Sequence, residues 1–131
     1  VSIDYKKNFF GEKKTYVLNG KKCTKKTPLE MAILAEKLGA GEIILTSIDN
    51  EGMMNGYDTE TIREISNAIN IPVIASGGAA NILDFKNVLY KCKADAVAAS
   101  SMFVYYGLNK AVLINFPEEY ELIESGVYSN D

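Results

Sequence analysis

The sequence of 131 residues contains no histidine and only two cysteines. Cys23 and Cys92 lie far apart and form no CxxC pair, which argues against a zinc site. Without histidine, no imidazole is available as a catalytic acid or base. We therefore expect no metal and no other cofactor. Both thiols are expected to be reduced in a cytoplasmic protein.

Long apolar runs are also missing. No segment approaches the ~20 residues of a membrane span, and no signal peptide is visible. The net charge of −3 and the pI near 5.0 give no electrostatic reason to expect nucleic acid or an anionic membrane as partner. Lysines gather in residues 6–26, which we interpret as a solvated hairpin and loop. The chain begins at Val1 inside an apparent strand and without Met, which favours a fragment.

Strand and helix patterns alternate along the chain. Apolar strands are predicted at residues 1–4, 42–47, 72–75 and 94–99, and a hairpin excursion follows the first strand between residues 9 and 19. Helix starts are marked by capping residues, with Thr27 followed by Pro28 and Glu30 as the clearest case. The predicted helices begin at residue 28, at residue 58 or 59, at residue 81 and at about residue 109, the last one ending near Asn115.

Continuous apolar strands separated by helices are typical of a parallel sheet covered by helices. The candidates are an open doubly wound sheet and a (βα)₈ barrel of the TIM type. Four βα units supply half of a barrel of ~250 residues. The glycine-rich turn follows the third strand, which would be strand seven of a complete barrel. We predict one α/β domain over residues 1–131, the C-terminal (βα)₄ half of such a barrel, with a C-terminal tail at 117–131.

The Ser76-Gly77-Gly78 turn is the strongest candidate for a binding site. Glycines after a strand allow the backbone to approach an oxyanion, and the next helix begins with free N–H groups. Ser100 and Ser101 follow the next strand and could add hydroxyl and N–H donors. Together the two turns predict a phosphate site without lysine. The alternative is that both are ordinary tight turns.

Other polar residues are expected at the same rim. Asp4 ends the first strand, where a barrel would direct a carboxylate at its substrate as general acid or base; the alternative is a surface carboxylate that caps a turn. Glu51 and Gly52 lie in the loop after the second parallel strand, and Asn19 lies in the hairpin. Each of these three is a possible substrate contact, with a solvated loop or a hairpin corner as the alternative.

Several segments closely resemble the cyclase subunit of imidazole glycerol phosphate synthase. They are residues 1–4 (VSID), 39–49 (GAGEIILTSID), 56–58 (GYD), 72–79 (PVIASGGA), 94–99 (ADAVAA) and 101–103 (SMF). The resemblance extends to about residue 116 and corresponds to the C-terminal half of that subunit's barrel. It implies a lyase of histidine biosynthesis that uses ammonia from a partner glutaminase to convert a phosphorylated ribotide into imidazole glycerol phosphate.

The resemblance also implies roles for individual residues. Asp4 matches one of two catalytic aspartates, and the other would lie in an N-terminal half that this chain lacks. The residues that match phosphate-holding or pocket-lining positions are Thr46, Ser76, Gly77, Gly78 and Ser101. Glu51 stands where the family usually has aspartate, and Asn19 where it usually has serine.

Two segments, residues 7–10 and 112–117, resemble a paralogous branch more closely. That branch implies a different function, in which the barrel is an ammonia conduit and scaffold for amidation of a surface-polysaccharide sugar. A third possibility is an inactive half-barrel. In each case the missing half would come from an N-terminal half-barrel or from a second copy of this chain.

Overall fold

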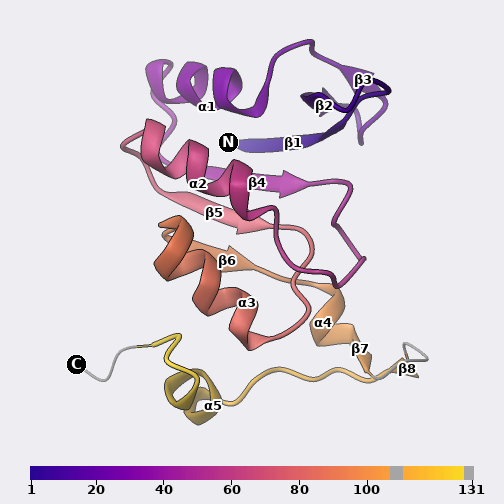
Figure 1. Cartoon of the computed structure of the whole chain (residues 1–131), viewed down its shortest axis with the longest axis vertical. Helices are drawn as coiled ribbons and strands as arrows, with labels where there is room; N and C mark the ends of the chain where they lie inside the picture. Colours follow the sequence, from indigo (N-terminus) through magenta and orange to yellow (C-terminus); the bar gives the residue numbers. More distant parts are fainter. Residues whose placement is uncertain (107–110, 129–131) are drawn as a thin grey trace.

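The computed structural model describes residues 1–106 and 111–128 and centres on a six-stranded sheet (Figure 1). The strand order is β3-β2-β1-β4-β5-β6. Four consecutive neighbours, β1, β4, β5 and β6, are parallel, while β2 and β3 extend the sheet as antiparallel hairpin strands. The strands are β1 (Ser2–Lys7), β2 (Lys13–Val17), β3 (Lys22–Cys23), β4 (Ile43–Ser47), β5 (Val73–Ser76) and β6 (Ala96–Ala98).

The helices that connect the parallel strands cover one face of the sheet (Figure 1). They are α1 (Pro28–Lys37), α2 (Thr59–Ala68) and α3 (Ile82–Lys86), which continues as the π-helical turn η1 (Asn87–Lys91). Right-handed crossovers between strands added in one direction place all helices on the same side. A doubly wound sheet would carry helices on both sides. The architecture is therefore that of a partial (βα)₈ barrel, and the predicted fold class is confirmed.

Capping residues explain where the helices begin. The Thr27 side chain accepts from the Glu30 N–H at 3.1 Å and Glu30 accepts from the Thr27 N–H at 2.7 Å, which completes the predicted capping box. Asp58 and Asn81 are the N-caps of α2 and α3. No helix in the described part of the chain has the length and apolar character needed to cross a membrane.

The core lies between the sheet and these helices. Alternate strand residues are buried on that side, namely Ile3, Tyr5, Ile43, Leu45, Val73 and Ala75. The residues between them point to the opposite face, as the period of two requires. That face is more open, since Ile44 is 38% exposed and Thr46 and Ser76 are only partly buried. The open face corresponds to the interior of a complete barrel.

The C-terminal part differs from the sequence prediction. The helix expected from about residue 109 to Asn115 is wrong where the chain is described: residues 107–110 lie outside the described part, and residues 111–112 form strand β8. Strand β8 (Ala111–Val112) pairs with β7 (Tyr105–Tyr106), directly after α4 (Ser101–Val104). Val112, Ile114 and Phe116 alternate with other residues at the period of a strand, and this segment continues extended, with Asn115 N–H donating to the Phe103 carbonyl at 2.8 Å.

Part of the expected C-terminal tail at 117–131 is a helix. Helix α5 (Glu119–Glu124) follows Pro117 and buries Leu122 to 7% exposure. Val127 is buried to the same extent, and both residues belong to the core cluster that includes Phe85. Residues 117–128 therefore pack against the domain instead of extending away from it.

Candidate functional site

A row of polar side chains crosses the open face of the sheet. In the strand register Asp4 lies beside Thr46, and Thr46 lies beside Ser76. On the other side of Asp4 the row continues with Tyr16 of β2. Asp4 is half-buried and accepts a hydrogen bond from the Ser2 hydroxyl at 3.1 Å. The hydroxyls of Thr46 and Ser76 have no hydrogen-bond partner among the described residues, so both are available to a ligand.

A small cavity lies where β4, β5 and β6 end. Three loops contribute to it, and we call it the cup. Six of its lining residues were predicted from the sequence, and the complete lining is Glu51, Gly52, Gly77, Gly78, Ala79, Ala99, Ser100 and Ser101. The structure therefore brings together the predicted glycine and serine turns and the loop that follows β4. Ser76 precedes the cup by one residue, so the polar row leads directly to it.

The two glycines of the cup are also required by loop packing. Gly77 has φ +92°, and a Cβ added there would lie 2.6 Å from the Ser47 carbonyl oxygen. Gly78 has φ +109°, and its added Cβ would overlap the carbonyl oxygen of Gly56. Residues other than glycine rarely adopt such φ values, and neither position has room for a Cβ atom beside the neighbouring carbonyl oxygen. These glycines thus allow the turn after β5 to lie against the loop after β4.

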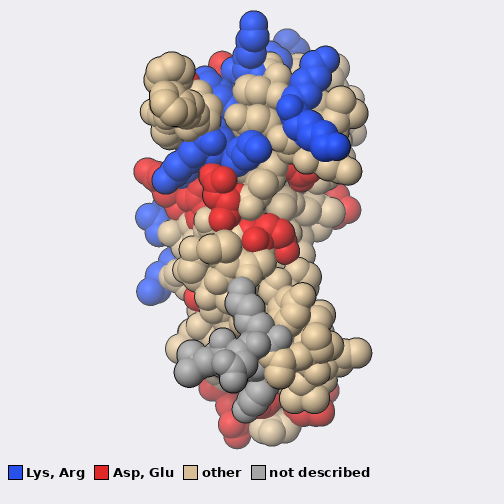
Figure 2. Space-filling view, turned by 90° about the vertical axis from the view of Figure 1, so that its right-hand side faces the viewer, with Lys and Arg blue, Asp and Glu red and all other residues tan. Residues whose placement is uncertain are grey.

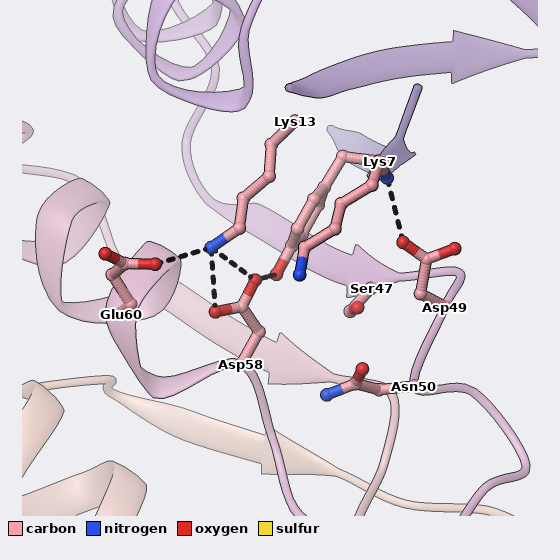
Figure 3. A pocket seen from close by; sticks show the side chains of 8 residues that line it. Lys7, Lys13, Ser47, Asp49, Asn50, Asp58 and Glu60 are labelled. Carbon is pink, nitrogen blue, oxygen red and sulfur yellow. Dashed lines mark hydrogen bonds and ion pairs between the residues drawn. The ribbon is translucent and has the colours of Figure 1, made fainter. Parts of the chain in front are cut away.

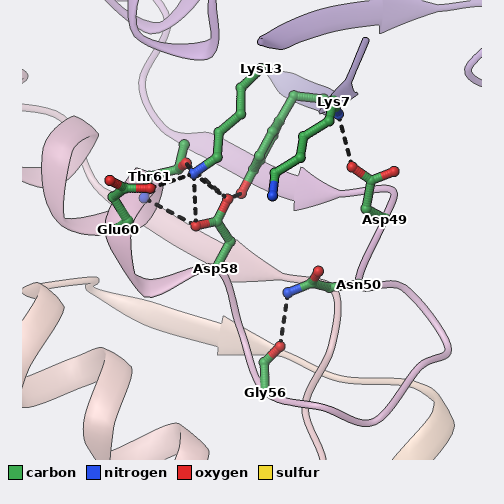
Figure 4. Close-up of polar contacts among 9 residues, drawn as sticks. Lys7, Lys13, Asp49, Asn50, Gly56, Asp58, Glu60 and Thr61 are labelled. Carbon is green, nitrogen blue, oxygen red and sulfur yellow. Dashed lines mark hydrogen bonds and ion pairs between the residues drawn. The ribbon is translucent and has the colours of Figure 1, made fainter. Parts of the chain in front are cut away.

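The loop at residues 48–57 is fixed at several points. Its Asp49 carboxylate accepts from the Lys7 backbone N–H at 2.8 Å, and the Asn50 amide donates to the Gly56 carbonyl at 3.0 Å (Figure 4). The Gly56 N–H donates to the Gly78 carbonyl at 2.8 Å. The buried Tyr57 hydroxyl donates to the Ala98 carbonyl at 2.9 Å. The loop that supplies Glu51 and Gly52 is therefore bonded to β1, to the turn after β5 and to β6.

A larger pocket of about 420 Å³ lies beside the hairpin. There the Lys13 ammonium contacts Asp58 at 3.0 Å and Glu60 at 2.9 Å, and it donates to the Thr61 hydroxyl at 2.7 Å (Figures 3 and 4). The Tyr5 hydroxyl donates to Asp58 at 3.0 Å. Tyr5 lies on the helix-covered side of the sheet, away from Asp4. We therefore interpret these ion pairs as structural contacts that attach the hairpin to the start of α2.

Burial and ion pairing act against each other in this cluster. Burial alone would raise the pKa of the Asp58 carboxyl, but hydrogen bonds from Lys13 and Thr61 outweigh it and hold that pKa below its ordinary value. Burial would lower the pKa of the Lys13 ammonium, and its bonds to Glu60 and Asp58 raise it above the ordinary value. Burial, followed by the nearby Asp58 charge, raises the pKa of the Tyr5 hydroxyl. Lysine, aspartate and tyrosine therefore keep their usual charges at neutral pH.

Charges are divided on the side of the molecule where the parallel strands end. Figure 2 shows this side, with lysine and arginine gathered toward the hairpin end and aspartate and glutamate in a band below it. None of the residues that line the cup is lysine or arginine, and Glu51 is its one charged lining residue. The described residues include no group of three or more His, Cys, Asp or Glu placed to hold a metal ion.

Two further residues considered from the sequence, Asn19 and Lys6, are not among the residues that line the cup. Asn19 is exposed in the turn between β2 and β3. The lysine-rich composition of residues 6–26 predicts a solvated Lys6, but alternation along β1 places it on the same face as Asp4, and its ammonium lies 4.6 Å from the centre of the Tyr16 ring. The period of two along β1 is the sequence signal that predicts Lys6 on the same face as Asp4.

Comparison with known proteins identifies one family and several similar proteins that carry the same subunit name. Residues 1–108 match the model of the family described as histidine biosynthesis protein. The imidazole glycerol phosphate synthase subunit HisF of a Dehalococcoides mccartyi strain is 53% identical over 105 residues, which is 80% of this chain and 41% of that protein. The HisF subunit of Chlorobium phaeobacteroides is 49% identical over 106 residues, 79% of this chain and 41% of that protein.

Another relative matches over a longer segment. It comes from Pseudomonas aeruginosa, is provisionally described as subunit hisF2 of imidazole glycerol phosphate synthase, and is 41% identical over 117 residues. This match covers 89% of the chain and 47% of that protein. The chain thus spans less than half the length of each of these relatives.

Proposed function

The chain belongs to the histidine biosynthesis protein family, and from this membership we propose that it forms part of the cyclase subunit of an imidazole glycerol phosphate synthase. The proposed reaction uses ammonia to convert a phosphorylated ribotide into imidazole glycerol phosphate in histidine biosynthesis. Relatives carry the name of a synthase subunit, and the proposed partner is a glutaminase that supplies the ammonia. The proposed compartment is the cytoplasm.

The observation that carries this proposal is the polar row that leads into the cup. Asp4, Thr46 and Ser76 lie side by side on three adjacent parallel strands, and the cup begins one residue beyond Ser76. A phosphorylated substrate with its phosphate in the cup would extend along this row toward Asp4. Glycine and serine N–H and O–H groups suit a phosphate, and a carboxylate suits proton transfer.

In this mechanism Asp4 is one member of an acid and base pair. One carboxylate takes a proton while the other gives one, so the pair requires a second group across the substrate. We propose that this second carboxylate belongs to another half-barrel, either in the same polypeptide or in a second copy. The open face of the sheet is where that half would enclose the substrate.

Substitution of Asp4 tests the proposal. Asp4→Asn keeps the shape of the side chain but removes the proton-transfer group, so ammonia-dependent turnover of the ribotide should fall by about 10²- to 10⁴-fold. The control is Asp95→Asn, which changes an exposed aspartate outside the row. Formation of imidazole glycerol phosphate from substrate and ammonium ions is the measurement. Full activity in the Asp4 variant would refute the assignment.

A second candidate function, the ammonia conduit and scaffold for amidation of a sugar, rests on the resemblance of residues 7–10 and 112–117 to a paralogous branch. The two functions differ in a direct assay. The cyclase turns over the ribotide when ammonium ions are supplied, whereas a scaffold leaves it unchanged and only stimulates a partner enzyme.

A further inference from the structure

One side-chain contact closes the mouth of the cup. The Ser100 hydroxyl donates to the Glu51 carboxylate at 2.8 Å and thereby joins the loop after β4 to the turn after β6. Ser100 is also the N-cap residue of α4, yet its side chain makes no capping hydrogen bond. The hydroxyl is therefore committed to Glu51 instead of to the helix.

With this contact in place the cup is too small for a phosphate group. Its volume is about 10 Å³, which is room for about one water molecule. A phosphate group carries four oxygens around phosphorus and needs considerably more space. The cup therefore has to open before it can hold one.

The walls of the cup differ in how easily they can move. Gly77 and Gly78 are buried and lie against the backbone of Ser47 and Gly56, so the floor is fixed. Glu51 is exposed, and its long side chain can rotate into solvent without leaving a hole in the core. Glu51 is thus the wall that can open.

The negative charge of Glu51 opposes phosphate binding, as the small volume of the closed cup also does. A carboxylate within a few ångströms of a phosphate repels it, and no lysine or arginine lines the cup to offset this repulsion. The same carboxylate occupies the Ser100 hydroxyl, which is one of the few donors that a phosphate could use. In the closed cup the Glu51 carboxylate therefore occupies the place of the phosphate and accepts the hydrogen bond that Ser100 could otherwise donate to it.

We propose that Glu51 is a latch on the cup and that an entering phosphate displaces it from Ser100. This inference rests on the proposed phosphate-binding function and deepens it, because it identifies the residue that controls access to the site. The Ser100 hydroxyl, once released, becomes a donor to the phosphate. Glu51 is accordingly a specificity-determining residue for the anion.

Two substitutions of Glu51 distinguish the effect of its side-chain length from the effect of its negative charge. Glu51→Asp keeps the charge but shortens the side chain by one carbon–carbon bond, so the carboxylate no longer reaches Ser100. Glu51→Gln keeps the length and an acceptor oxygen but removes the charge. Glu64→Asp makes the same chemical change as Glu51→Asp at an exposed site on α2 and serves as the matched control. Circular dichroism confirms that each variant is folded.

Inorganic phosphate is titrated into the purified protein and its variants, and the amide resonances of Gly77 and Gly78 report binding in the cup. We expect Glu51→Asp to bind phosphate about tenfold more tightly than the parent, the equivalent of one hydrogen bond. Glu51→Gln loses the repelling charge but can still bond Ser100, so it should gain less than Glu51→Asp, and Glu64→Asp should equal the parent.

The possible failures are distinguishable. If the parent and Glu51→Asp bind phosphate equally at the cup, the latch is wrong and the phosphate-binding function stands. A gain for Glu51→Gln that equals or exceeds the gain for Glu51→Asp assigns the effect to charge and also overturns the latch. If neither the parent nor any variant shows shifts at Gly77 and Gly78, the proposed phosphate site itself fails, and the latch fails with it.

Discussion

The turn after β5 allows a stability prediction that isolates steric fit from backbone conformation. In Gly78→Ala the new methyl group would overlap the Gly56 carbonyl oxygen, and it would also lie 2.9 Å from the Asn50 Cβ. Gly11→Ala is the matched control, because Gly11 also has a positive φ, +81°, but has no atom within 4 Å of an added Cβ. Both variants therefore carry the cost of a positive φ, and they differ in the contact.

The expected magnitudes follow from these environments. A residue with Cβ held at positive φ costs roughly 1–2 kcal/mol, which is the whole effect expected for Gly11→Ala. Forcing a methyl group into a packed contact adds about 1–3 kcal/mol, so Gly78→Ala should lose about 2–5 kcal/mol of unfolding free energy. Loops at Gly56 and Gly78 would have to separate, and the hydrogen bond between the Gly56 N–H and the Gly78 carbonyl would weaken.

Urea unfolding followed by far-UV circular dichroism measures this difference, since the protein has no tryptophan for fluorescence. Hydrogen exchange at the Gly56 amide provides a local readout, and it should accelerate in Gly78→Ala but not in Gly11→Ala. The reasoning is refuted if Gly78→Ala loses no more stability than Gly11→Ala, or if Gly56 exchanges at the same rate in both.

Two further substitutions test the hairpin cluster and the C-terminal helix. Lys13→Met removes the partner of Asp58 and Glu60 and should cost about 1–3 kcal/mol at pH 7. Because the folded-state pKa of Asp58 is lowered, its stabilisation is complete above the unfolded-state value near ~3.9 and is lost as the pH falls through the folded-state value. The difference between parent and Lys13→Met in urea midpoint should therefore shrink toward pH 2, and a difference that is constant with pH would contradict the ion-pair explanation. Leu122→Ala should cost about 2–3 kcal/mol in the same assay, whereas Tyr120→Ala, at a residue that is 60% exposed, should cost little; equal effects would mean that α5 is not anchored through Leu122.

The elements that could be predicted from the sequence are those specified by local chemistry. The capping box at Thr27 and the cap at Asp58 mark helix starts because their side chains satisfy N–H groups only a few residues away. The buried strands are continuous apolar runs for a similarly local reason. Their sequential, parallel order follows because right-handed crossovers and helices of this length leave few alternatives.

The parts that could not be predicted depend on contacts between distant residues. Residues 111–115 are apolar enough for a helix or a strand, and pairing with residues 103–106 decides for an extended conformation. Lys13 and Asp58 are 45 residues apart, and no local pattern indicates that they pair. The register that places Asp4 beside Thr46 is likewise determined by the pairing of β1 with β4, which neither strand's sequence specifies alone.

The glycines of the cup show that residues predicted to bind a ligand can also be required by loop packing. Sequence reasoning attributes Gly77 and Gly78 to close approach of a bound anion, yet their closest neighbours are the Ser47 and Gly56 backbones. Any larger residue would push the loop after β4 away and carry Glu51 with it. The glycines thus act on the ligand indirectly, because they hold the latch residue within reach of Ser100. A glycine pair after a strand therefore predicts close approach, while the group that makes the approach is decided by the neighbouring strand.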